Sequence, residues 1–388
     1  MPQSVDQRFA RVRELFEQER REAKIARTLD DIPISFELIS HEWLSRVLCA
    51  GVHGAEVTAH TLDIDREGTT NRGRIFLQYN AAGQAAKLPP SVFCKATQTL
   101  ESRFILGLNN CAEGEITFYN KVRALLDIEA PVAYFSKIDR ESLNSITLLR
   151  DMTGQVEFCD ERTQVSQTMA RDQLGVLARL HGKFYGKSGR ETPLSDYQTI
   201  EEFNRLTEEG VHWSERGYEG LLQAEPVVPA RLLARAKDIW PATSRAFARH
   251  GDLPRTLIHN DVHLKNWYIT SAGRMGLSDW QCVVRGHWCR DLAYVISSSL
   301  SPDNRRAWER ELIAYYLECL AGQGIPTPSL DQTMRLYRQQ LFAALQMWTV
   351  TLARPEGAPE MQPPATSLEF IRRIATAIDD HNAFASFD

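Results

Sequence analysis

The chain has 388 residues, of which 43% are hydrophobic and 24% charged, and 45 Lys and Arg against 50 Asp and Glu give a formal net charge of −5. These values are ordinary for a globular protein of two or three domains, and they exclude a disordered or collagen-like chain. The mild acidity argues against a nucleic-acid binder, and no apolar run approaches the ~18 residues of a membrane-spanning helix. The seven cysteines lie far apart without a C-x-x-C pair, so we expect a cytoplasmic protein with reduced, mostly buried thiols.

The first 150 residues change from a helical to a strand-like pattern. Apolar residues recur at helical spacing among dense charge at 4–29, which predicts an outer amphipathic helix, and a short helix is predicted at 42–48. Short β-prone runs separated by turn residues predict strands at 57–65, 74–79, 91–96, 133–136 and 145–149. A single helix that includes Glu115 is predicted after the third strand. The result is a compact α+β unit that ends near Arg150.

Beyond residue 154 the pattern is mainly helical. Apolar residues on one face predict helices at 165–184, 331–352 and 367–378. Residues 256–279 are the exception, because brief apolar runs there flank a polar loop. We therefore expect an N-terminal helical extension at 1–30, a small sheet-bearing N-lobe at 31–150 and a larger, mainly helical C-lobe at 151–388.

The densest polar cluster runs from His259 to Asn266 with the sequence His-Asn-Asp-Val-His-Leu-Lys-Asn, and Asp279 follows thirteen residues later at the end of an apolar run. Polar groups held between apolar segments are usually positioned for a task, because an unpaired buried charge is costly. An acid, an amide five residues on and a second acid form the set that phosphoryl transfer needs. Asp261 would orient the proton of a substrate hydroxyl, and the oxygen ligands Asn266 and Asp279 would hold Mg²⁺ on nucleotide phosphates.

Phosphoryl transfer also requires a cation on the α/β-phosphates, a carboxylate that holds this cation and a loop over the phosphates. Lys95 is out of place in the apolar strand at 91–96, and Glu115, favoured over Glu113, lies on the following predicted helix. The turn between the first two strands, where the phosphate loop is expected, contains Gly68, Thr69 and Thr70.

The pattern H-N-D-x-H-x-x-N followed by S-D-W resembles the catalytic and metal-binding loops of the aminoglycoside phosphotransferase and choline kinase superfamily, the small-molecule relatives of protein kinases. The resemblance implies a bilobal protein-kinase-like fold whose N-lobe holds an antiparallel sheet. It also implies an ATP- and Mg²⁺-dependent kinase with a small-molecule hydroxyl acceptor, although GTP as donor stays open. Asp261 would be the catalytic base, and Asn266 and Asp279 the magnesium ligands.

Further positions agree with this resemblance. Glu115 matches the family's E-x-x-F-Y pattern, and the acid of Arg290-Asp291 would brace the loop at 259–266. The backbone from Arg150 to Met152, directly after the fifth strand, would read the adenine. Residues 32–33 and 42–44 resemble the ecdysteroid-kinase-like branch more than the antibiotic-resistance enzymes.

The sequence also departs from the family pattern. The phosphate loop is not G-x-G-x-x-G, and Asn260 stands where glycine is common. Lys265 likewise stands where glycine is common, and neither it nor Asn260 removes a catalytic group. The acceptor itself is not readable, because the region expected to bind it, residues 192–255 with the C-terminal helices, carries no known code.

Two other functions are compatible with parts of the sequence. The first is a metal-dependent hydrolase, with metal ligands drawn from His259, Asp261, His263 and Asp279. It leaves Asn266, Lys95 and Glu115 unexplained. The second is an inactive nucleotide-binding scaffold, against which the intact set of polar residues argues.

Overall fold

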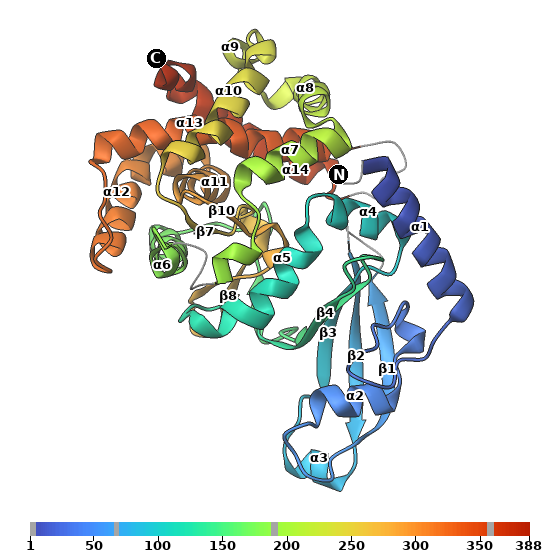
Figure 1. Ribbon diagram of the computed structural model, residues 1–388. Helices are drawn as coiled ribbons and strands as arrows, with labels where there is room; N and C mark the ends of the chain where they lie inside the picture. Colours follow the sequence, from blue (N-terminus) through green and yellow to red (C-terminus); the bar gives the residue numbers. More distant parts are fainter. Residues whose placement is uncertain (1–4, 66–69, 188–192, 355–360) are drawn as a thin grey trace. The chain divides into compact units, whose positions relative to one another are not determined.

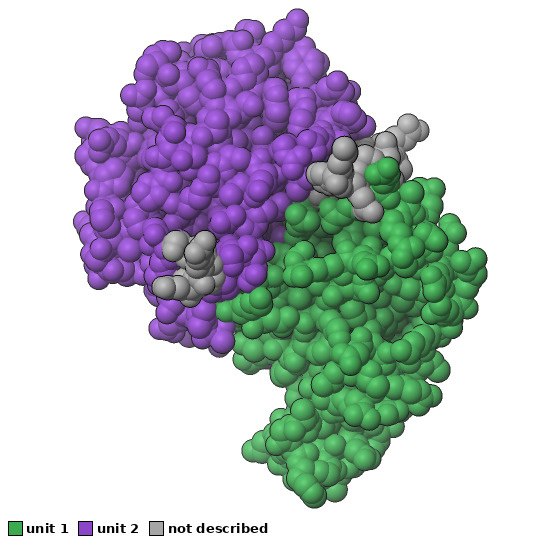
Figure 2. All heavy atoms as spheres, in the orientation of Figure 1, with its two compact units in different colours: residues 1–123, 131–153, 359–361 green, residues 124–130, 154–358, 362–388 purple. Residues whose placement is uncertain are grey.

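The computed structural model describes residues 5–65, 70–187, 193–354 and 361–388. The chain forms two compact units (Figure 1, Figure 2). Unit 1 comprises residues 1–123, 131–153 and 359–361, and unit 2 comprises residues 124–130, 154–358 and 362–388. Within the described ranges, no helix is both long and apolar enough to cross a membrane. The predicted domain boundaries at residues 30 and 150 stay predictions.

Unit 1 is built on a five-stranded antiparallel sheet with the strand order β1-β2-β3-β5-β4. Its strands are β1 (Val57–Asp65), β2 (Asn71–Tyr79), β3 (Ser91–Ala96), β4 (Ala133–Ile138) and β5 (Ser145–Arg150). Buried and more exposed side chains alternate along the second half of β2, where Ile75, Leu77 and Tyr79 enter the core. All five predicted strands are present, although β2 begins three residues earlier than predicted.

Helix α2 (His41–Leu48) contributes three buried residues, Trp43, Leu44 and Leu48, to the core of unit 1. Ser40 caps this helix by accepting a hydrogen bond from the backbone N–H of Trp43 at 3.0 Å. The buried Trp43 and Leu44 join the strand residues of the core, and the Trp43 ring lies edge-on to Phe135 with the centroids 5.3 Å apart. The predicted helix at 42–48 is thus confirmed.

The helices that flank the sheet differ from the prediction. Helix α1 (Val5–Glu22) is shorter than the predicted 4–29, because Ala23 has a φ of 42° and Ala26 forms a bridge with Ile39. Two helices, α4 (Leu100–Leu108) and α5 (Cys111–Thr117), follow β3 where one was predicted. Asn110 separates them with a left-handed φ of 56°. A short helix, α3 (Ala81–Ala85), also lies inside a segment predicted to be a turn.

Arg103 ties α1 to the rest of unit 1. Its guanidinium is fully buried, and it forms an ion pair of 2.7 Å with Glu19 and lies 4.9 Å from the centre of the Phe16 ring. The same group donates to the backbone oxygens of Thr97 and Ser142, each at 3.1 Å. One side chain therefore joins α1, α4, the end of β3 and the loop before β5.

Unit 2 is mainly helical. Its helices are α6 (Gln167–Phe184), α7 (Ile200–Val211), α8 (Trp213–Gln223), α9 (Ala230–Leu233), α10 (Ala236–Ala248), α11 (Cys289–Ser299), α12 (Pro302–Ala321), α13 (Leu330–Leu352) and α14 (Pro364–Asp380). Helix α13 is central and packs against α8, α10, α11 and α14 (Figure 1). The prediction of an α+β chain with an N-terminal antiparallel sheet and a mainly helical C-terminal part is confirmed.

Two small sheets in unit 2 carry the polar loop. One has the order β6-β8-β9 and the other pairs β10 with β7. Their strands are β6 (Val156–Phe158), β7 (Thr256–Ile258), β8 (Trp267–Thr270), β9 (Met275–Leu277) and β10 (Val284–Gly286). The sequence did not predict β6 or β10, because three-residue strands carry too little periodicity to be recognised.

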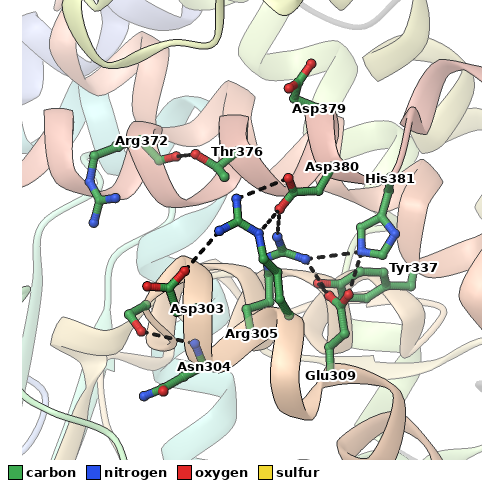
Figure 3. A network of polar contacts seen from close by, with 12 residues as sticks. Asp303, Asn304, Arg305, Glu309, Tyr337, Arg372, Thr376, Asp379, Asp380 and His381 are labelled. Atoms are coloured by element: carbon green, nitrogen blue, oxygen red, sulfur yellow. Dashed lines mark hydrogen bonds and ion pairs between the residues drawn. The ribbon is translucent and has the colours of Figure 1, made fainter.

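A network of charged side chains holds α12 to α14 (Figure 3). The buried Arg305 on α12 pairs with Glu309 at 2.8 Å and with Asp380 at the end of α14. Glu309 also pairs with His381 at 2.9 Å and accepts a hydrogen bond from the hydroxyl of Tyr337 at 3.3 Å. Each buried charge thus faces an opposite charge or a donor, as burial requires.

The thiols are distributed over both units. Six of the seven cysteines are buried and Cys319 is half-buried. Burial raises the pKa of Cys94 and Cys289 well above the ordinary value, so these thiols stay protonated. The expectation of mostly buried thiols is confirmed.

Candidate active site

Unit 1 brings together two of the predicted residues. Lys95 on β3 and Glu115 on α5 form an ion pair of 2.7 Å between Nζ and Oε1, with side-chain exposures of 6% and 8%. Glu113 instead pairs with the exposed Arg140 at 2.6 Å. The structure therefore selects Glu115 as the carboxylate that holds the buried lysine.

The face of the sheet that carries Lys95 holds other polar residues. Lys95 lies opposite Arg72 on β2 and Thr147 on β5, and directly opposed residues share one face of a sheet. Arg72 donates from Nε to the hydroxyl of the buried Thr70 at 3.0 Å. The other two predicted phosphate-loop residues, Gly68 and Thr69, lie outside the described residues. Arg72 was missed because the sequence placed it in a turn and not in β2.

In the segment predicted to read the adenine, the middle residue is buried and hydrogen-bonded, which the sequence did not predict. Arg150 is exposed and Met152 half-buried, but Asp151 between them is buried. Asp151 accepts hydrogen bonds from Ser91 at 2.6 Å and from Arg74 at 2.8 and 3.0 Å. Burial raises the pKa of Asp151, but these donors together with Thr153 outweigh burial and lower it to about 2. The backbone after β5 is therefore tied to β2 and β3.

Unit 2 holds the polar loop 259–266, which we call the Asp261 loop, between β7 and β8. Asp291 on α11 braces its start by accepting the backbone N–H of His259 at 2.7 Å and of Asn260 at 2.8 Å. His259 and the oxygen of Ser278 lie 3.0 Å apart, which ties the loop to the end of β9. Asn260, which stands where the family commonly has glycine, has a left-handed φ of 67°. Its side-chain oxygen accepts from Nε of Arg290 at 3.0 Å.

Asp261 is held by groups on both carboxylate oxygens. Asn266 donates to the backbone oxygen of Asp261 at 2.7 Å and to its Oδ2 at 3.2 Å, while Nε2 of His263 lies 3.5 Å from Oδ2. The hydroxyl of Tyr294 donates to Oδ1 at 3.3 Å. Burial raises the pKa of Asp261, but His263 and His259 lower it by more than burial raises it. The pKa therefore lies below its ordinary value. An ionised Asp261 can accept a proton or orient a hydroxyl.

The β8–β9 hairpin ties Asn266 to Ser278, the residue directly before Asp279. Ser278, the residue before Asp279, donates from both its backbone N–H and its hydroxyl to the backbone oxygen of Asn266, at 2.8 and 2.9 Å. Asp279 then adopts a left-handed φ of 61°. Hydrogen bonds thus join Asn266 to Asp261 and to Ser278, and Asp279 follows Ser278 in the chain.

The residues present fit Mg²⁺ better than Zn²⁺. Because the amide nitrogen of Asn266 donates to Asp261, its amide oxygen is the atom left to ligate a metal, and the carboxylate of Asp279 would be the second oxygen ligand. Mg²⁺ is usually bound by one or two carboxylates plus phosphates and water. No group of three His, Cys, Asp or Glu side chains that could hold a metal ion occurs among the residues that the structure describes.

The region predicted to bind the acceptor forms helices α7 to α10. A cavity of about 640 Å³ between α8, α10 and α13 is lined mainly by apolar and aromatic side chains, among them Leu221, Ile239 and Trp240. Gln346 of α13 lines this cavity, whereas Trp348, two residues later, has its ring centroid 5.0 Å from that of His263. Positions two apart are about 200° apart around a helix, so the cavity and the Asp261 loop lie on opposite sides of α13.

These features define a protein-kinase-like fold, and comparison with solved structures agrees. A structure from Ralstonia eutropha described as an aminoglycoside phosphotransferase has a TM-score of 0.53 at 14% identity, with 88% of this chain and 97% of that chain covered. A microcompartment-associated aminopropanol kinase has a TM-score of 0.52 at 11% identity, with 84% and 93% covered. Choline kinase from Cryptosporidium parvum has a TM-score of 0.51 at 10% identity, with 84% and 90% covered. At such identities the likeness establishes the fold alone.

The family follows from the sequence itself. A model of the phosphotransferase enzyme family matches residues 97–327, more than half of the chain. The chain therefore belongs to this family, and the resemblance to the aminoglycoside phosphotransferase and choline kinase superfamily is confirmed. A comparison with curated proteins finds no match. The ecdysteroid-kinase-like branch stays a prediction.

Proposed function

We propose that the protein transfers the γ-phosphoryl group of ATP, with Mg²⁺, to a hydroxyl of a small molecule. Family membership supplies the reaction class, phosphotransfer. The observation that carries the finer proposal is the Asp261 loop, where Asn266 donates to Asp261 and is tied through Ser278 to Asp279. The buried pair of Lys95 and Glu115 supports it from unit 1.

Each residue has a separate role in this proposal. Asp261 orients the acceptor hydroxyl and takes its proton as the new P–O bond forms. Lys95, held by Glu115, contacts the α/β-phosphates as a positive charge. Asn266 and Asp279 would hold Mg²⁺, which when bound supplies charge neutralisation on the phosphates. The remaining contribution of the protein is positioning.

A metal-dependent hydrolase is less well supported. Both ring nitrogens of His259 already have partners, because Nε2 lies 3.0 Å from the oxygen of Ser278 and Nδ1 accepts from the backbone N–H of Asp261 at 3.3 Å. A histidine engaged on both nitrogens does not ligate a metal. That reading also gives no role to Lys95 and Glu115.

The deciding experiment is a screen for ADP release from ATP, with GTP in parallel, against pooled amino alcohols, sterols, sugars and aminoglycosides. We expect at least one acceptor to stimulate nucleotide consumption in the presence of Mg²⁺, and chelation of the metal to abolish it. Nucleotide-independent hydrolysis of an ester or phosphoester pool with stoichiometric zinc would refute the proposal.

Variants then test the assigned roles. We expect Asp261→Asn to lower kcat by ~10²–10⁴-fold, the usual contribution of a general base. Binding of Mg–ATP, measured by calorimetry, should remain near the wild-type value. The matched control is Asp303→Asn, an exposed aspartate on α12 whose change should leave kcat unaffected. Asp279→Ala should abolish the magnesium-dependent shift of Tm by ATP, and a wild-type shift would exclude Asp279 as a ligand.

A further inference from the structure

The sequence interpretation gave no role to Tyr294. This residue lies on α11, the helix whose Asp291 holds the start of the Asp261 loop. Its side chain is 1% exposed, and its hydroxyl donates to Oδ1 of Asp261 at 3.3 Å. The helix that carries it begins at Cys289 and also supplies Asp291, which accepts two backbone N–H groups of the loop. One rigid element thus holds both the backbone of the loop and its carboxylate.

Tyr294 is itself fixed by the residue one turn earlier. The guanidinium of Arg290 lies 4.7 Å from the centre of the Tyr294 ring, a distance at which a cation attracts the face of an aromatic ring. Arg290 also donates to the side-chain and backbone oxygens of Asn260, at 3.0 and 3.3 Å. The tyrosine ring is therefore held without its hydroxyl, which leaves the hydroxyl's contact with Asp261 as a separate interaction.

The two oxygens of Asp261 have different partners. Oδ2 faces the loop's own residues, Asn266 at 3.2 Å and His263 at 3.5 Å, whereas Oδ1 faces Tyr294 from the helix. A carboxylate that accepts hydrogen bonds on only one oxygen can still rotate about its Cβ–Cγ bond. Donors on both oxygens fix the plane of the carboxylate.

We infer that Tyr294 is a positioning residue for phosphoryl transfer, which sets the plane of the Asp261 carboxylate through its hydroxyl. The inference rests on the proposed function of Asp261. It predicts that loss of the hydroxyl lowers the rate of the chemical step and leaves nucleotide binding intact, since Tyr294 acts through Asp261 and not on the nucleotide.

The test is Tyr294→Phe, which keeps the ring beside Arg290 and removes only the donor. The readout is ADP release from Mg–ATP, with the acceptor found by the screen and with water in its absence. A misplaced catalytic group costs up to ~10²-fold, so we expect kcat to fall ~10- to 100-fold. The KM for Mg–ATP should stay within about twofold of wild type.

The matched control is Tyr337→Phe. Tyr337 is also fully buried, and its hydroxyl also donates to a carboxylate, Glu309, at 3.3 Å in the network between α12 and α14 (Figure 3). Both variants should lower Tm by a similar amount. Only Tyr294→Phe should lower kcat, and an equal loss of kcat in both variants would reduce Tyr294 to a structural residue.

A double-mutant cycle separates the positioning role from general destabilisation. In the Asp261→Asn background, Tyr294→Phe should cause no further loss of rate, because the carboxylate that it positions is gone. The same fold-loss in both backgrounds would overturn the inference. If Asp261→Asn is inactive while Tyr294→Phe retains full kcat, only the role of Tyr294 is wrong. If the wild-type protein releases no ADP with any acceptor or water, the proposed function fails and the role of Tyr294 with it.

Discussion

Two polar residues of unit 2, Asn260 and Asp279, adopt left-handed backbone conformations, with φ values of 67° and 61°. Asn and Asp tolerate this region better than other residues with a side chain. Glycine would adopt it with less strain, but it could not accept the hydrogen bond from Arg290 to Oδ1 of Asn260. Asn260, in place of the family's glycine, thus has a more strained backbone but gains a hydrogen bond to α11.

This trade gives a prediction for Asn260. Asn260→Ala keeps a Cβ in the left-handed region and loses the bond to Arg290, so we expect a loss of ~2–3 kcal/mol in the free energy of unfolding. Asn260→Gly loses the bond but relieves the strain, and should cost less, ~1 kcal/mol. Urea denaturation of both variants measures the order. A smaller loss for alanine than for glycine would contradict the argument.

A second prediction concerns Glu115. Replacing one member of a buried ion pair leaves a buried charge poorly compensated, which costs ~3–5 kcal/mol. We expect Glu115→Gln to lower stability by this amount and to raise the KM for Mg–ATP through Lys95. The control is Glu113→Gln, which removes only a pair with the exposed Arg140 and should cost less than ~1 kcal/mol. Equal effects in the two variants would show that Glu115 is not the partner that matters.

Some site residues were predictable from the sequence and others were not. Lys95 could be predicted because a lysine in an apolar strand needs a partner of opposite charge. Asp261 could be predicted because Asn266 follows it five residues later. Asp151 and Tyr294 gave no such signal. Each acts on a residue far along the chain, Arg74 or Asp261, and such pairs depend on how elements pack.

At the scale of elements, α8 and α13 approach each other unusually closely. A Cβ built on Gly220 of α8 would lie 1.8 Å from the backbone oxygen of Thr349 on α13. Backbone cannot give way as the end of a side chain can, so this contact requires glycine. The cavity lined by Gln346 lies along the same pair of helices.

For this contact we predict that alanine substitution changes the free energy of unfolding in opposite directions at two helical glycines. Alanine usually stabilises a helix interior relative to glycine by up to ~1 kcal/mol. We expect Gly175→Ala on α6, where the nearest atom outside the helix's own backbone would be 3.7 Å away, to show this gain or no change. Gly220→Ala should instead lose ~1–3 kcal/mol through overpacking. Thermal unfolding reports both, and a stabilising Gly220→Ala would show that α8 can shift away from α13 at little cost.

Element boundaries were the weakest part of the sequence prediction. The single helix predicted after β3 is two helices, because Asn110 turns left-handed between them and Thr99 starts the first with a capping box. The outer helix ends early at Glu22, since Ala26 is needed as a bridge to Ile39. In the first place local backbone conformation ends the helix, and in the second a contact with another segment does.

At the scale of the whole molecule, stability depends on buried histidines that stay neutral. Nδ1 of His250 accepts the backbone N–H of His287 at 2.8 Å, and Nε2 lies 3.2 Å from the oxygen of Gln340. Only the neutral ring can accept on Nδ1. Burial lowers the pKa of His250 to about 4, although Gln340 and Glu201 act in the opposite direction.

The pH dependence follows from the sign of this shift. The unfolded chain binds a proton at His250 near pH 6.5, and the folded protein only near pH 4, so the contribution to stability is full above pH 6.5 and is lost as the pH falls from 6.5 to 4. A shift of this size corresponds to roughly 3 kcal/mol. We expect the free energy of unfolding, measured by urea denaturation between pH 7 and 4, to fall less steeply in His250→Gln. An unchanged slope would exclude His250 as a source of acid sensitivity.

The general architecture was the most predictable level. The change from β-prone runs to helical periodicity near residue 150 predicted the sheet and the helical part, because each is built from long, regular patterns. The acceptor region could not be predicted in the same way. Of its helices, α8 and α10 pack on α13, α7 packs on α8 and α10, and α9 packs on α14, and the side chains that would select a substrate follow no period.

Each unit contains three buried thiols, so their reactivity reports on the unfolding of that unit. Cys49, Cys94 and Cys111 lie in unit 1, and Cys159, Cys282 and Cys289 lie in unit 2. A thiol reagent that modifies Cys319 in the native protein would reach the other six only through local or global opening. Peptide-resolved labelling rates would then show whether the two units open together or one after the other, and whether nucleotide slows the opening of one unit more than the other.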